Sequence, residues 1–481
     1  MEAQEVGKRI SLRDNENVHL LPKYVIFQSN INNLYLHSDA KNPDVPNALR
    51  FAGDYSFGLE TRYEVVPDSK ETGLIHILSL RNNMYWEISE AHDKKWITAT
   101  AKTPEEKQCT LFEPVFVGFN NKHAVKLRHV NTGLYVRMFN GSDHYDGCLY
   151  LDPVLQDSEA WTFINWKTVV VLPDLVRIKG DNGNHLKAFG GDGYMDYNNK
   201  PDNTSLFDFQ VHPSRDGGVR LRSTYYDKYW TDMDDSYWVL LKEASTTVHE
   251  TNTVFLPTIV SGNHIVMRCL RNGYFCKRLS DKHKTSCVAT VHSYPDEWSI
   301  MEIEEPLISR EIYNIRYHYT DARRYDEKTV ALIDDDSSND SKATELKTEL
   351  NLKTKVTNTA TWTNNVGFKV GVEIKFEAGL PVVGKSEIGV STEFTASRTW
   401  GVTEEKEVEV GKVVSVTVPP KTRLKGSLMA TRCSFDIPFS YTQHDVLKDG
   451  TPRVTEKDDG VLTGHNGYGY KHKLVELPLG E

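Results

Sequence analysis

The sequence predicts an all-β protein with two tandem β-trefoils followed by an elongated antiparallel β-sheet domain. Three observations support this fold class. An aromatic motif recurs every 45–50 residues through the first two thirds of the chain, and short apolar segments separated by turn residues fill each interval. The remaining third carries alternating segments about a dozen residues long. Such segments are typical of strands, and helical periodicity is nearly absent.

Composition excludes several classes of protein. The 481 residues include 26% charged and 39% hydrophobic residues, with a net charge of −10. A general nucleic-acid binder is not expected, because phosphate neutralisation needs clustered Lys and Arg. No secretory signal is visible at the N-terminus and no run approaches the ~20 apolar residues of a membrane helix. The sequence therefore predicts a cytoplasmic protein.

The six cysteines fit no zinc spacing, and no metal or cofactor is predicted. We expect reduced, unpaired thiols, although Cys276 and Cys287 could be neighbours across a hairpin. The chain also lacks a Walker loop, GxSxG, HExxH and a recognisable pair of catalytic carboxylates. An enzyme is therefore not expected.

Six copies of one unit fill the first 307 residues. The copies are NNLYLHS (32–38), NNMYWEIS (82–89), NTGLYVRM (131–138), GNHLKAF (183–189), DKYWTDM (227–233) and RNGYFCKR (271–278). The segment VVVLPDLV (169–176) interrupts the series after three copies. Two closed three-fold barrels, at 1–167 and 168–307, explain this break. A six-bladed propeller is the alternative.

Two paired motifs carry a resemblance to a lectin family. NMYWEISEAHDKKWITATA (83–101) and DKYWTDMDDSYWVLLKEA (227–244) resemble the agglutinin domains of the amaranthin family of plant lectins. The resemblance implies binding of glycans of the galactose or N-acetylgalactosamine type. A sugar site needs an aromatic face and short polar groups. The candidates with these properties are Asn82, Asn83, Tyr85, Asp227, Tyr229, Trp230 and Asp232. Alternatively, the aromatic residues alternate in and out of a barrel wall, so that half of them are core, and the asparagines only form turns.

After Pro306 the chain becomes rich in Thr, Ser, Lys, Glu and Val, and residues 308–481 are predicted to form the third domain. Segments that alternate for a dozen residues predict strands longer than the usual five or six. The acidic segment ALIDDDSSNDSK (331–342) is interpreted as a solvated loop. A calcium site there is the alternative, but the ligand order of a calcium loop is missing.

Within this domain, residues 366–396 predict a two-faced hairpin. Two arms, 366–378 and 386–396, each reach the ~9–11 residues that a tilted strand needs to cross a bilayer. The apolar face and the uncharged bend comprise Val366, Phe368, Val370, Val372, Ile374, Phe376, Leu380, Pro381, Val382, Val383, Ile388, Val390 and Phe394. Lys and Glu alternate on the opposite face. A single hairpin has unpaired edges, so several chains would have to close a barrel together.

The segment KFEAGLPVVGKSEI (375–388) resembles the insertion-loop tip of aerolysin-type β-pore-forming proteins, with Leu380–Val383 as its bend. The flanking Thr-rich strands agree with the same family. The resemblance implies a lectin that forms a homo-oligomer and inserts hairpins into a membrane, in plant defence. Two alternatives stay open. The hairpin could be a half-buried element of a β-sandwich, or the protein could be a cytosolic stress lectin whose last domain only mediates oligomerisation.

Overall fold

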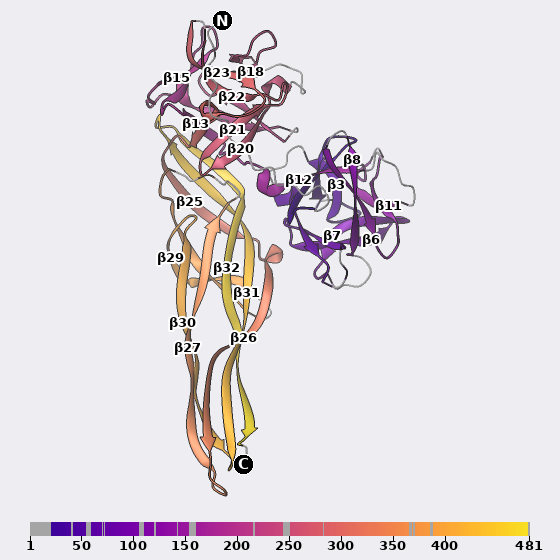
Figure 1. Ribbon diagram of the computed structural model, residues 1–481, viewed down its shortest axis with the longest axis vertical. Coiled ribbons are helices and arrows are strands. Elements are labelled where there is room, and N and C mark those ends of the chain that lie inside the picture. The colour runs from indigo at the N-terminus through magenta and orange to yellow at the C-terminus, as the bar shows by residue number, and fades with distance from the viewer. Residues whose placement is uncertain are drawn as a thin grey trace. The chain divides into compact units, whose positions relative to one another are not determined.

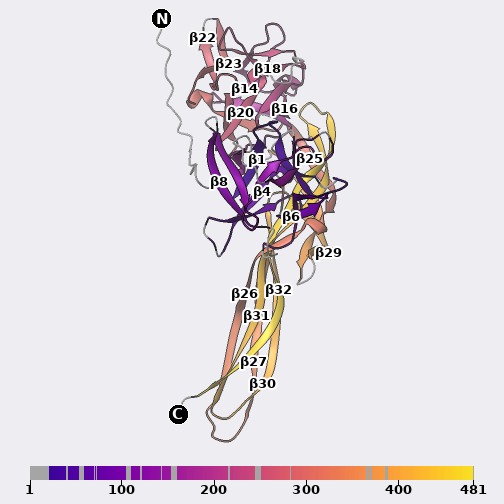
Figure 2. The ribbon, with the colours of Figure 1, turned by 90° about the vertical axis from the view of Figure 1, so that its right-hand side faces the viewer.

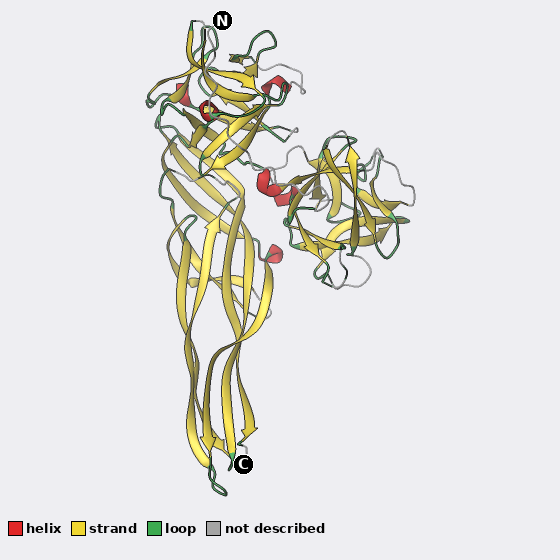
Figure 3. Ribbon diagram, viewed as in Figure 1, coloured by secondary structure: helices red, strands yellow, loops and turns green. Residues whose placement is uncertain are grey.

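The computed structural model of the chain (Figure 1) consists of β-strands and short 3-10 turns, with no α-helix among the described residues (Figure 3). The prediction of an all-β fold is confirmed. No helix in this part of the chain is long and apolar enough to cross a membrane. The structure describes residues 21–479 except 40–41, 54–58, 70, 72, 105–109, 120–121, 142, 153–159, 215–216, 244–250, 282, 365–367, 369–370 and 385–387.

Packing divides the chain into two compact units. The first unit contains Met1–Ile308, Asn365–Val372 and Val446–Pro452. The second contains Ser309–Asn364, Glu373–Asp445 and Arg453–Glu481. Two 12-stranded sheets belong to the first unit, and a six-stranded sheet with a separate two-stranded sheet forms most of the second.

The first 12-stranded sheet is a β-trefoil. Its strands are β1 (Tyr24–Ser29), β2 (Tyr35–Asp39), β3 (Ala48–Gly53), β4 (Tyr63–Pro67), β5 (Ile75–Ser79), β6 (Met84–Ala91), β7 (Lys94–Ala101), β8 (Phe112–Phe119), β9 (Lys122–His129), β10 (Tyr135–Met138), β11 (Leu149–Asp152) and β12 (Trp161–Asn165). Antiparallel pairs run β1–β4, β4–β5, β5–β8, β8–β9, β9–β12 and β12–β1, so six strands close a barrel. The hairpins β2–β3, β6–β7 and β10–β11 complete the three repeats.

The second 12-stranded sheet repeats this plan. Its strands are β13 (Leu175–Gly180), β14 (His185–Ala188), β15 (Met195–Asn199), β16 (Phe209–Pro213), β17 (Val219–Ser223), β18 (Tyr229–Asp232), β19 (Val239–Lys242), β20 (Phe255–Ser261), β21 (His264–Cys269), β22 (Phe275–Asp281), β23 (Lys284–His292) and β24 (Met301–Glu304). The barrel closes through β13–β16, β16–β17, β17–β20, β20–β21, β21–β24 and β24–β13. Two separately closed barrels exclude the propeller.

Aromatic side chains fill both barrels. In the first, Phe27 lies between Trp86 and Trp161, with ring centroids 5.8 and 6.0 Å away. In the second, Trp230 lies between Phe209 and Phe255 at 5.5 and 5.7 Å. Large rings of this kind supply the buried apolar area that stabilises such small barrels. Each predicted repeat motif lies at the start of a hairpin strand: β2, β6, β10, β14, β18 and β22.

The second unit contains much longer strands. They are β25 (Leu307–Tyr317), β26 (Arg323–Asn339), β27 (Leu346–Thr363), β30 (Thr403–Val418), β31 (Thr422–Leu447) and β32 (Pro452–Pro478). Strands β31 and β32 have 26 and 27 residues, which is several times the usual length. The order is β25-β31-β32-β27-β30, with β26 on β31, and the long strands run side by side in both views (Figures 1 and 2).

Glycines allow the core of this sheet to be aromatic. Phe435 and Phe439 on β31 are fully buried, and they lie over Gly464 and Gly460 of β32. A Cβ atom at Gly460 would lie 2.4 Å from the Phe439 ring, which is closer than real side chains approach. A Cβ atom at Gly464 would likewise lie 2.7 Å from the Phe435 ring.

The acidic segment 331–342 is not a loop over most of its length, which corrects the sequence-based interpretation. Residues up to Asn339 belong to β26 and pair with β31. Asp334 lies 2.8 Å from Lys425, and Asp336 lies 2.8 Å from Arg423. Cross-strand cations thus neutralise the carboxylates and permit a strand that local propensity disfavours. Among the described residues, no cluster of His, Cys, Asp and Glu could hold a metal ion.

The five described cysteines are free and buried. Cys276 faces Thr290 and Cys287 faces Leu279 in the β22–β23 ladder, so the two thiols are not cross-strand neighbours. Burial raises the pKa of the Cys287 thiol to about 11. The described cysteines therefore pack as buried, unreactive apolar residues.

Candidate functional site

In the first trefoil, the predicted sugar residues lie on the turn before β6 and at the start of that strand. Asn82 Nδ2 donates to the Ala99 carbonyl at 2.8 Å, and Asn82 Oδ1 accepts from the Met84 amide at 3.2 Å. Asn83 has a φ of 54°, which lies in the left-handed region.

 Asn83 therefore adopts the conformation that suits a tight turn. Tyr85 is partly exposed and meets His76 edge-to-face, with ring centroids 6.3 Å apart. The turn thus holds Asn82 in place for the fold and leaves part of the Tyr85 ring at the surface.

In the second trefoil, the corresponding turn precedes β18. Asp227 has a φ of 59° and pairs with Arg222. Tyr229 is partly exposed, and its ring centroid lies 5.9 Å from that of His212. Asp227 and Tyr229 therefore stay at the surface and resemble the Asn83 and Tyr85 pair of the first trefoil.

Trp230 and Asp232 are buried, so the structure corrects the prediction that they contact a sugar. The Trp230 side chain is 0% exposed and lies in the barrel core, where it cannot stack on a ligand. Asp232 is also 0% exposed and accepts hydrogen bonds from Arg271 Nε at 2.7 Å and Asn272 Nδ2 at 2.9 Å. The hydroxyl of Thr290 donates to the same carboxylate. Asp232 therefore ties β18 to β23 and to the turn before β22, which is a structural role.

The predicted hairpin is present as a separate two-stranded sheet. Strand β28 (Lys375–Val383) pairs with β29 (Ile388–Thr399), from Lys375 opposite Thr399 to Val383 opposite Ile388. The prediction that residues 380–383 form the bend is wrong, because Leu380–Val383 are strand residues paired with β29. Pro381 is tolerated there because β28 has only one partner strand. The connection between the strands comprises residues 384–387, of which Gly384 is described.

One face of β28 is buried against an aromatic cluster. Phe376 is 4% exposed, and its ring centroid lies 5.7 Å from both Trp362 and Trp400. Ala378 on the same face and Ile374, which directly precedes the strand, are also buried. Glu373, Lys375 and Glu377 alternate with them and are exposed. The even-numbered face of this arm is therefore covered within the second unit, while its charged face meets water.

The aromatic cluster joins the hairpin to the long sheet. The ring centroid of Trp400 lies 5.8 Å from Phe439 and 5.1 Å from Tyr441, both on β31. Trp362 Nε1 donates to the Tyr317 hydroxyl at 2.9 Å. Sequence analysis missed this cluster. A signal was available, because Trp362 and Trp400 flank the hairpin at the ends of two Thr-rich segments.

The turn end of the hairpin has a separate contact. Arg324 on β26 donates from its guanidinium to the Gly384 carbonyl. The same guanidinium lies 3.5 Å from the Glu327 carboxylate and 5.4 Å from the centroid of the Tyr468 ring. One arginine thus connects the turn end to β26 and β32. Nothing in the local sequence pattern indicates this role.

Among the described residues before β28, Phe368 and Val372 do not extend the hairpin, contrary to the prediction of a first arm from residue 366. Val366 and Val370 lie outside the described residues, and Val372 lies in a bend. Phe368 is 7% exposed and belongs to the hydrophobic core cluster of the second trefoil, together with Val176 and Ile303. Of the other predicted membrane-facing residues, Val390 and Phe394 lie on β29.

Two family models match the chain in separate regions. Residues 19–163 match the agglutinin domain, and residues 310–442 match the Clostridium epsilon toxin ETX/Bacillus mosquitocidal toxin MTX2 family. The chain joins an agglutinin domain to an aerolysin-like toxin domain. The agglutinin match covers the first trefoil, and the toxin match covers most of the second unit, which we call the toxin domain.

Similar proteins include a cytotoxin of Pseudomonas aeruginosa, which is 35% identical over 71 residues. The match covers 15% of this chain and 25% of the cytotoxin, so the chain spans about a quarter of that relative's length. Among solved structures, the hemolytic lectin CEL-III has 10% identity and a TM-score of 0.33, with 92% of this chain and 91% of that chain covered. A mosquitocidal holotoxin has 8% identity and a TM-score of 0.30, with 62% and 36% covered. A lamprey immune protein has 14% identity and a TM-score of 0.32, with 64% and 100% covered.

Proposed function

We propose that this protein binds glycans through its trefoils and inserts the β28–β29 hairpin into a membrane as part of an oligomeric pore. The observation that carries the proposal is the covered apolar face of β28. Phe376 packs against Trp362 and Trp400 of the toxin domain, and Ala378 and the preceding Ile374 are also buried, although β28 pairs only with β29. The hairpin can therefore leave without breaking a backbone ladder of the six-stranded sheet.

The dimensions of the hairpin suit a membrane strand pair. Strands β28 and β29 have 9 and 12 residues, and a tilted transmembrane strand needs ~9–11. Glu373, Lys375 and Glu377 would face a water-filled lumen, while the even-numbered face would meet lipid. A single hairpin would leave unpaired backbone groups in hydrocarbon, so several copies of the chain must contribute to one closed barrel.

Glycan binding would bring the protein to its target surface. The agglutinin domain and the partly exposed Tyr85 and Tyr229 support this step, with galactose- or N-acetylgalactosamine-type glycans as the proposed class. Binding at a surface raises the local concentration and so favours oligomerisation. We place the soluble form in the cytoplasm, as the free buried cysteines fit a reducing compartment, and propose a role in plant defence.

The test is dye release from liposomes that carry galactose-terminated glycolipids. We expect the wild-type chain to release dye and to form a cross-linkable oligomer on the liposomes. Leu380→Lys places a charge on the even-numbered face of β28, the proposed lipid face, at about 2–4 kcal/mol per copy near the midplane, and should abolish release. Glu377→Lys is the matched control, since it changes charge on the exposed face of β28 and should release dye normally.

Two results would contradict the proposal. Either the wild-type chain releases no dye from liposomes to which it binds, or Leu380→Lys releases dye as the wild type does. The first result would favour the alternative of a lectin whose toxin domain only mediates oligomerisation. Cross-linking in the same experiment identifies that case, because the oligomer would then form without release.

A further inference from the structure

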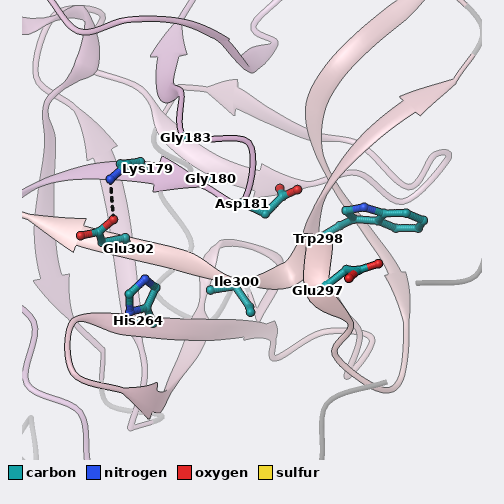
Figure 4. Close-up of a pocket in the computed structure, with 9 residues that line it drawn as sticks. All are labelled: Lys179, Gly180, Asp181, Gly183, His264, Glu297, Trp298, Ile300 and Glu302. Carbon is teal, nitrogen blue, oxygen red and sulfur yellow. Dashed lines mark hydrogen bonds and ion pairs between the residues drawn. The ribbon is translucent and has the colours of Figure 1, made fainter. Parts of the chain in front are cut away.

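The second trefoil contains an open cavity of about 560 Å³ that none of the predicted sugar residues lines. Its walls come from the end of β13, the β13–β14 turn, the start of β21, the 3-10 turn η6 (Glu297–Ser299) and β24. Figure 4 shows Asp181, Glu297 and Trp298 at one end of the cavity, with His264 and the Lys179–Glu302 ion pair at the other. The volume suits a small ligand, since such sites usually measure ~300–1,000 Å³.

Trp298 is held in this wall by a buried ion pair. Asp296 is 1% exposed and accepts hydrogen bonds from the Trp298 amide at 3.1 Å and the Ser299 hydroxyl at 3.0 Å. Lys277, 3% exposed, pairs with Asp296, and its Nζ lies 4.6 Å from the centroid of the Trp298 ring. Burying an ion pair is unfavourable unless further hydrogen bonds satisfy it, as they do here. The pair fixes the backbone and one face of Trp298, while the ring stays partly exposed.

The position of Trp298 distinguishes this repeat from the other two in the same trefoil. Each repeat has a three-residue 3-10 turn two residues before its last barrel strand: η4 (Ser205–Phe207), η5 (Thr251–Thr253) and η6. The central residue is Leu206 in η4 and Asn252 in η5, but Trp298 in η6. The fold therefore does not require a large aromatic residue at the centre of this 3-10 turn. Contact with a ligand would explain why η6 has a Trp there.

Hydrogen bonds hold several polar groups of the cavity in place. Arg278 holds the Asp181 carboxylate through two hydrogen bonds of 2.8 and 2.6 Å, which leaves lone pairs of both oxygens for hydroxyl donors. At the other end of the cavity, one hydrogen bond of 2.7 Å from Lys179 Nζ holds the Glu302 carboxylate. His264 Nδ1 lies 3.2 Å from the Ser261 carbonyl, so Nε2 can interact with a ligand.

This combination selects one class of ligand. Carboxylates of Asp181, Glu297 and Glu302 would repel a phosphate, a sulfate or a sialic acid. A metal ion is disfavoured because Arg278 and Lys179 already neutralise two of these carboxylates. A pyranose ring without charge fits both features, because its C–H face packs on an indole and its hydroxyls donate to carboxylates.

We propose that the cavity of Trp298, Asp181 and Glu297 binds one neutral hexose unit of the glycan, an inference that rests on the lectin function proposed above. Trp298 supplies the apolar platform, and Asp181 and Glu297 accept from adjacent hydroxyls. The site lies entirely within the second trefoil and so needs no second copy of the chain. It is also separate from the turns that carry Tyr85 and Tyr229.

The test uses the full-length chain on an array of neutral, sialylated and sulfated glycans, followed by titration with the strongest neutral ligand. We expect Trp298→Ala and Asp181→Asn each to weaken binding by about tenfold or more, and Trp298→Phe to retain most of the affinity. Tyr274→Ala is the matched control, since Tyr274 is an exposed aromatic residue of the same trefoil that does not line the cavity. Thermal melting of each variant checks that the barrel remains folded.

The outcomes separate this inference from the proposed function. If the wild-type chain binds glycans and both Trp298→Ala and Asp181→Asn bind equally well, the site is elsewhere and only this inference is wrong. Preference for sialylated or sulfated glycans, weakened by Trp298→Ala, would overturn the neutral class. If the wild-type chain binds no glycan at all, the lectin function fails and the inference fails with it.

Discussion

The trefoils and the toxin domain are both β-folds, but their strands differ in length and in whether the sheet closes. Each trefoil closes six short strands into a barrel around aromatic residues, so the barrel has no free edge. The toxin domain has strands of up to 27 residues in an open sheet, with β30 at one edge and a hairpin outside the ladder. A closed barrel is suited to a rigid binding surface, whereas an open sheet with a separate hairpin has elements that can be rearranged.

Side chains are also more completely buried in the trefoil cores than in the toxin domain. In the second trefoil, Trp230 is surrounded on all sides within one core cluster. In the toxin domain, the long strands β27 and β30 alternate between buried and exposed residues, and on β28 Phe376 and Ala378 are buried while Lys375 and Glu377 are exposed. The free energy of opening should therefore be high and uniform in the barrels, and lower at the hairpin. The predictions below test this difference, starting with the largest effect.

Trp230→Ala should produce the largest loss of stability. Removing a fully buried indole costs about 3–5 kcal/mol, because the barrel cannot collapse around the cavity. Calorimetry should show the transition of the second trefoil at a lower temperature and the toxin-domain transition unchanged. Tyr229→Ala is the control on the neighbouring, partly exposed residue and should cost about 1 kcal/mol or less. Equal shifts of both transitions would show that the two regions do not unfold separately.

Phe376→Ala should loosen the hairpin without affecting the barrels. The lost packing against Trp362 and Trp400 is worth about 3 kcal/mol, and the loss would fall on the element that Phe376 holds in place. Amide hydrogen exchange should accelerate throughout β28 and β29 but not in β27 or the trefoils. Glu377→Ala, on the exposed face of the same strand, should leave exchange unchanged. Slow exchange of β28 in Phe376→Ala would mean that the aromatic cluster does not hold the hairpin.

Arg324→Ala should act only at the turn end. A hydrogen bond from a charged donor contributes about 1.5–3 kcal/mol, and part of this is retained through water when the contact is exposed. Exchange at residues 382–388 should accelerate, while exchange near Phe376 stays slow. Arg324→Lys keeps the charge but loses the planar guanidinium, so it should give an intermediate rate. Uniform acceleration along the hairpin would show that the two ends do not open separately.

The parts of the fold that repeat could be predicted from the sequence, because six similar turns each report the same local structure. The alternation in Tyr229–Trp230 indicates that one ring faces the core, but only the position of the barrel axis determines which one. The bend at residues 380–383 was misplaced because Pro381 favours a turn locally, whereas the pairing of Val383 with Ile388 sets the register. The acidic strand β26 depends on cations of β31 that lie about ninety residues away in the chain.

The Trp298 cavity likewise depends on contacts between residues far apart in the chain, which local sequence patterns do not predict. Its residues come from both ends of the second trefoil sequence, and barrel closure through β13 and β24 brings them together. No single turn motif contains both Trp298 and Asp181. Comparison of η4, η5 and η6 was the signal that could have found it, because a Trp replaces Leu and Asn at one place in the repeat.

The smallest effect should be the different response of the two regions to pH and salt. The hydrogen bond from His185 at 2.9 Å, with the charges of His185, Lys179 and Lys448, lowers the pKa of Glu304 in the second trefoil. Lys425 and Arg423 likewise lower the pKa values of Asp334 and Asp336 in the toxin domain. A carboxylate with a lowered folded-state pKa stabilises the fold above its unfolded pKa, and this stabilisation disappears as the pH falls through the folded pKa.

The second trefoil should therefore lose stability as the pH falls below about 4.5, the usual pKa of a Glu, and the toxin domain as it falls below about 3.8, the usual pKa of an Asp, but salt should distinguish them. Asp334 and Asp336 are exposed, so their ion pairs are screened, whereas Glu304 is half-buried and its hydrogen bond is not. Thermal melts between pH 6 and pH 3 should show that high salt flattens the pH dependence of the toxin domain and preserves that of the second trefoil. Glu304→Gln should then flatten the trefoil dependence alone. A trefoil dependence that high salt removes would mean that Glu304 behaves as a surface carboxylate, and that the closed barrel shields its polar contacts no better than the open sheet does.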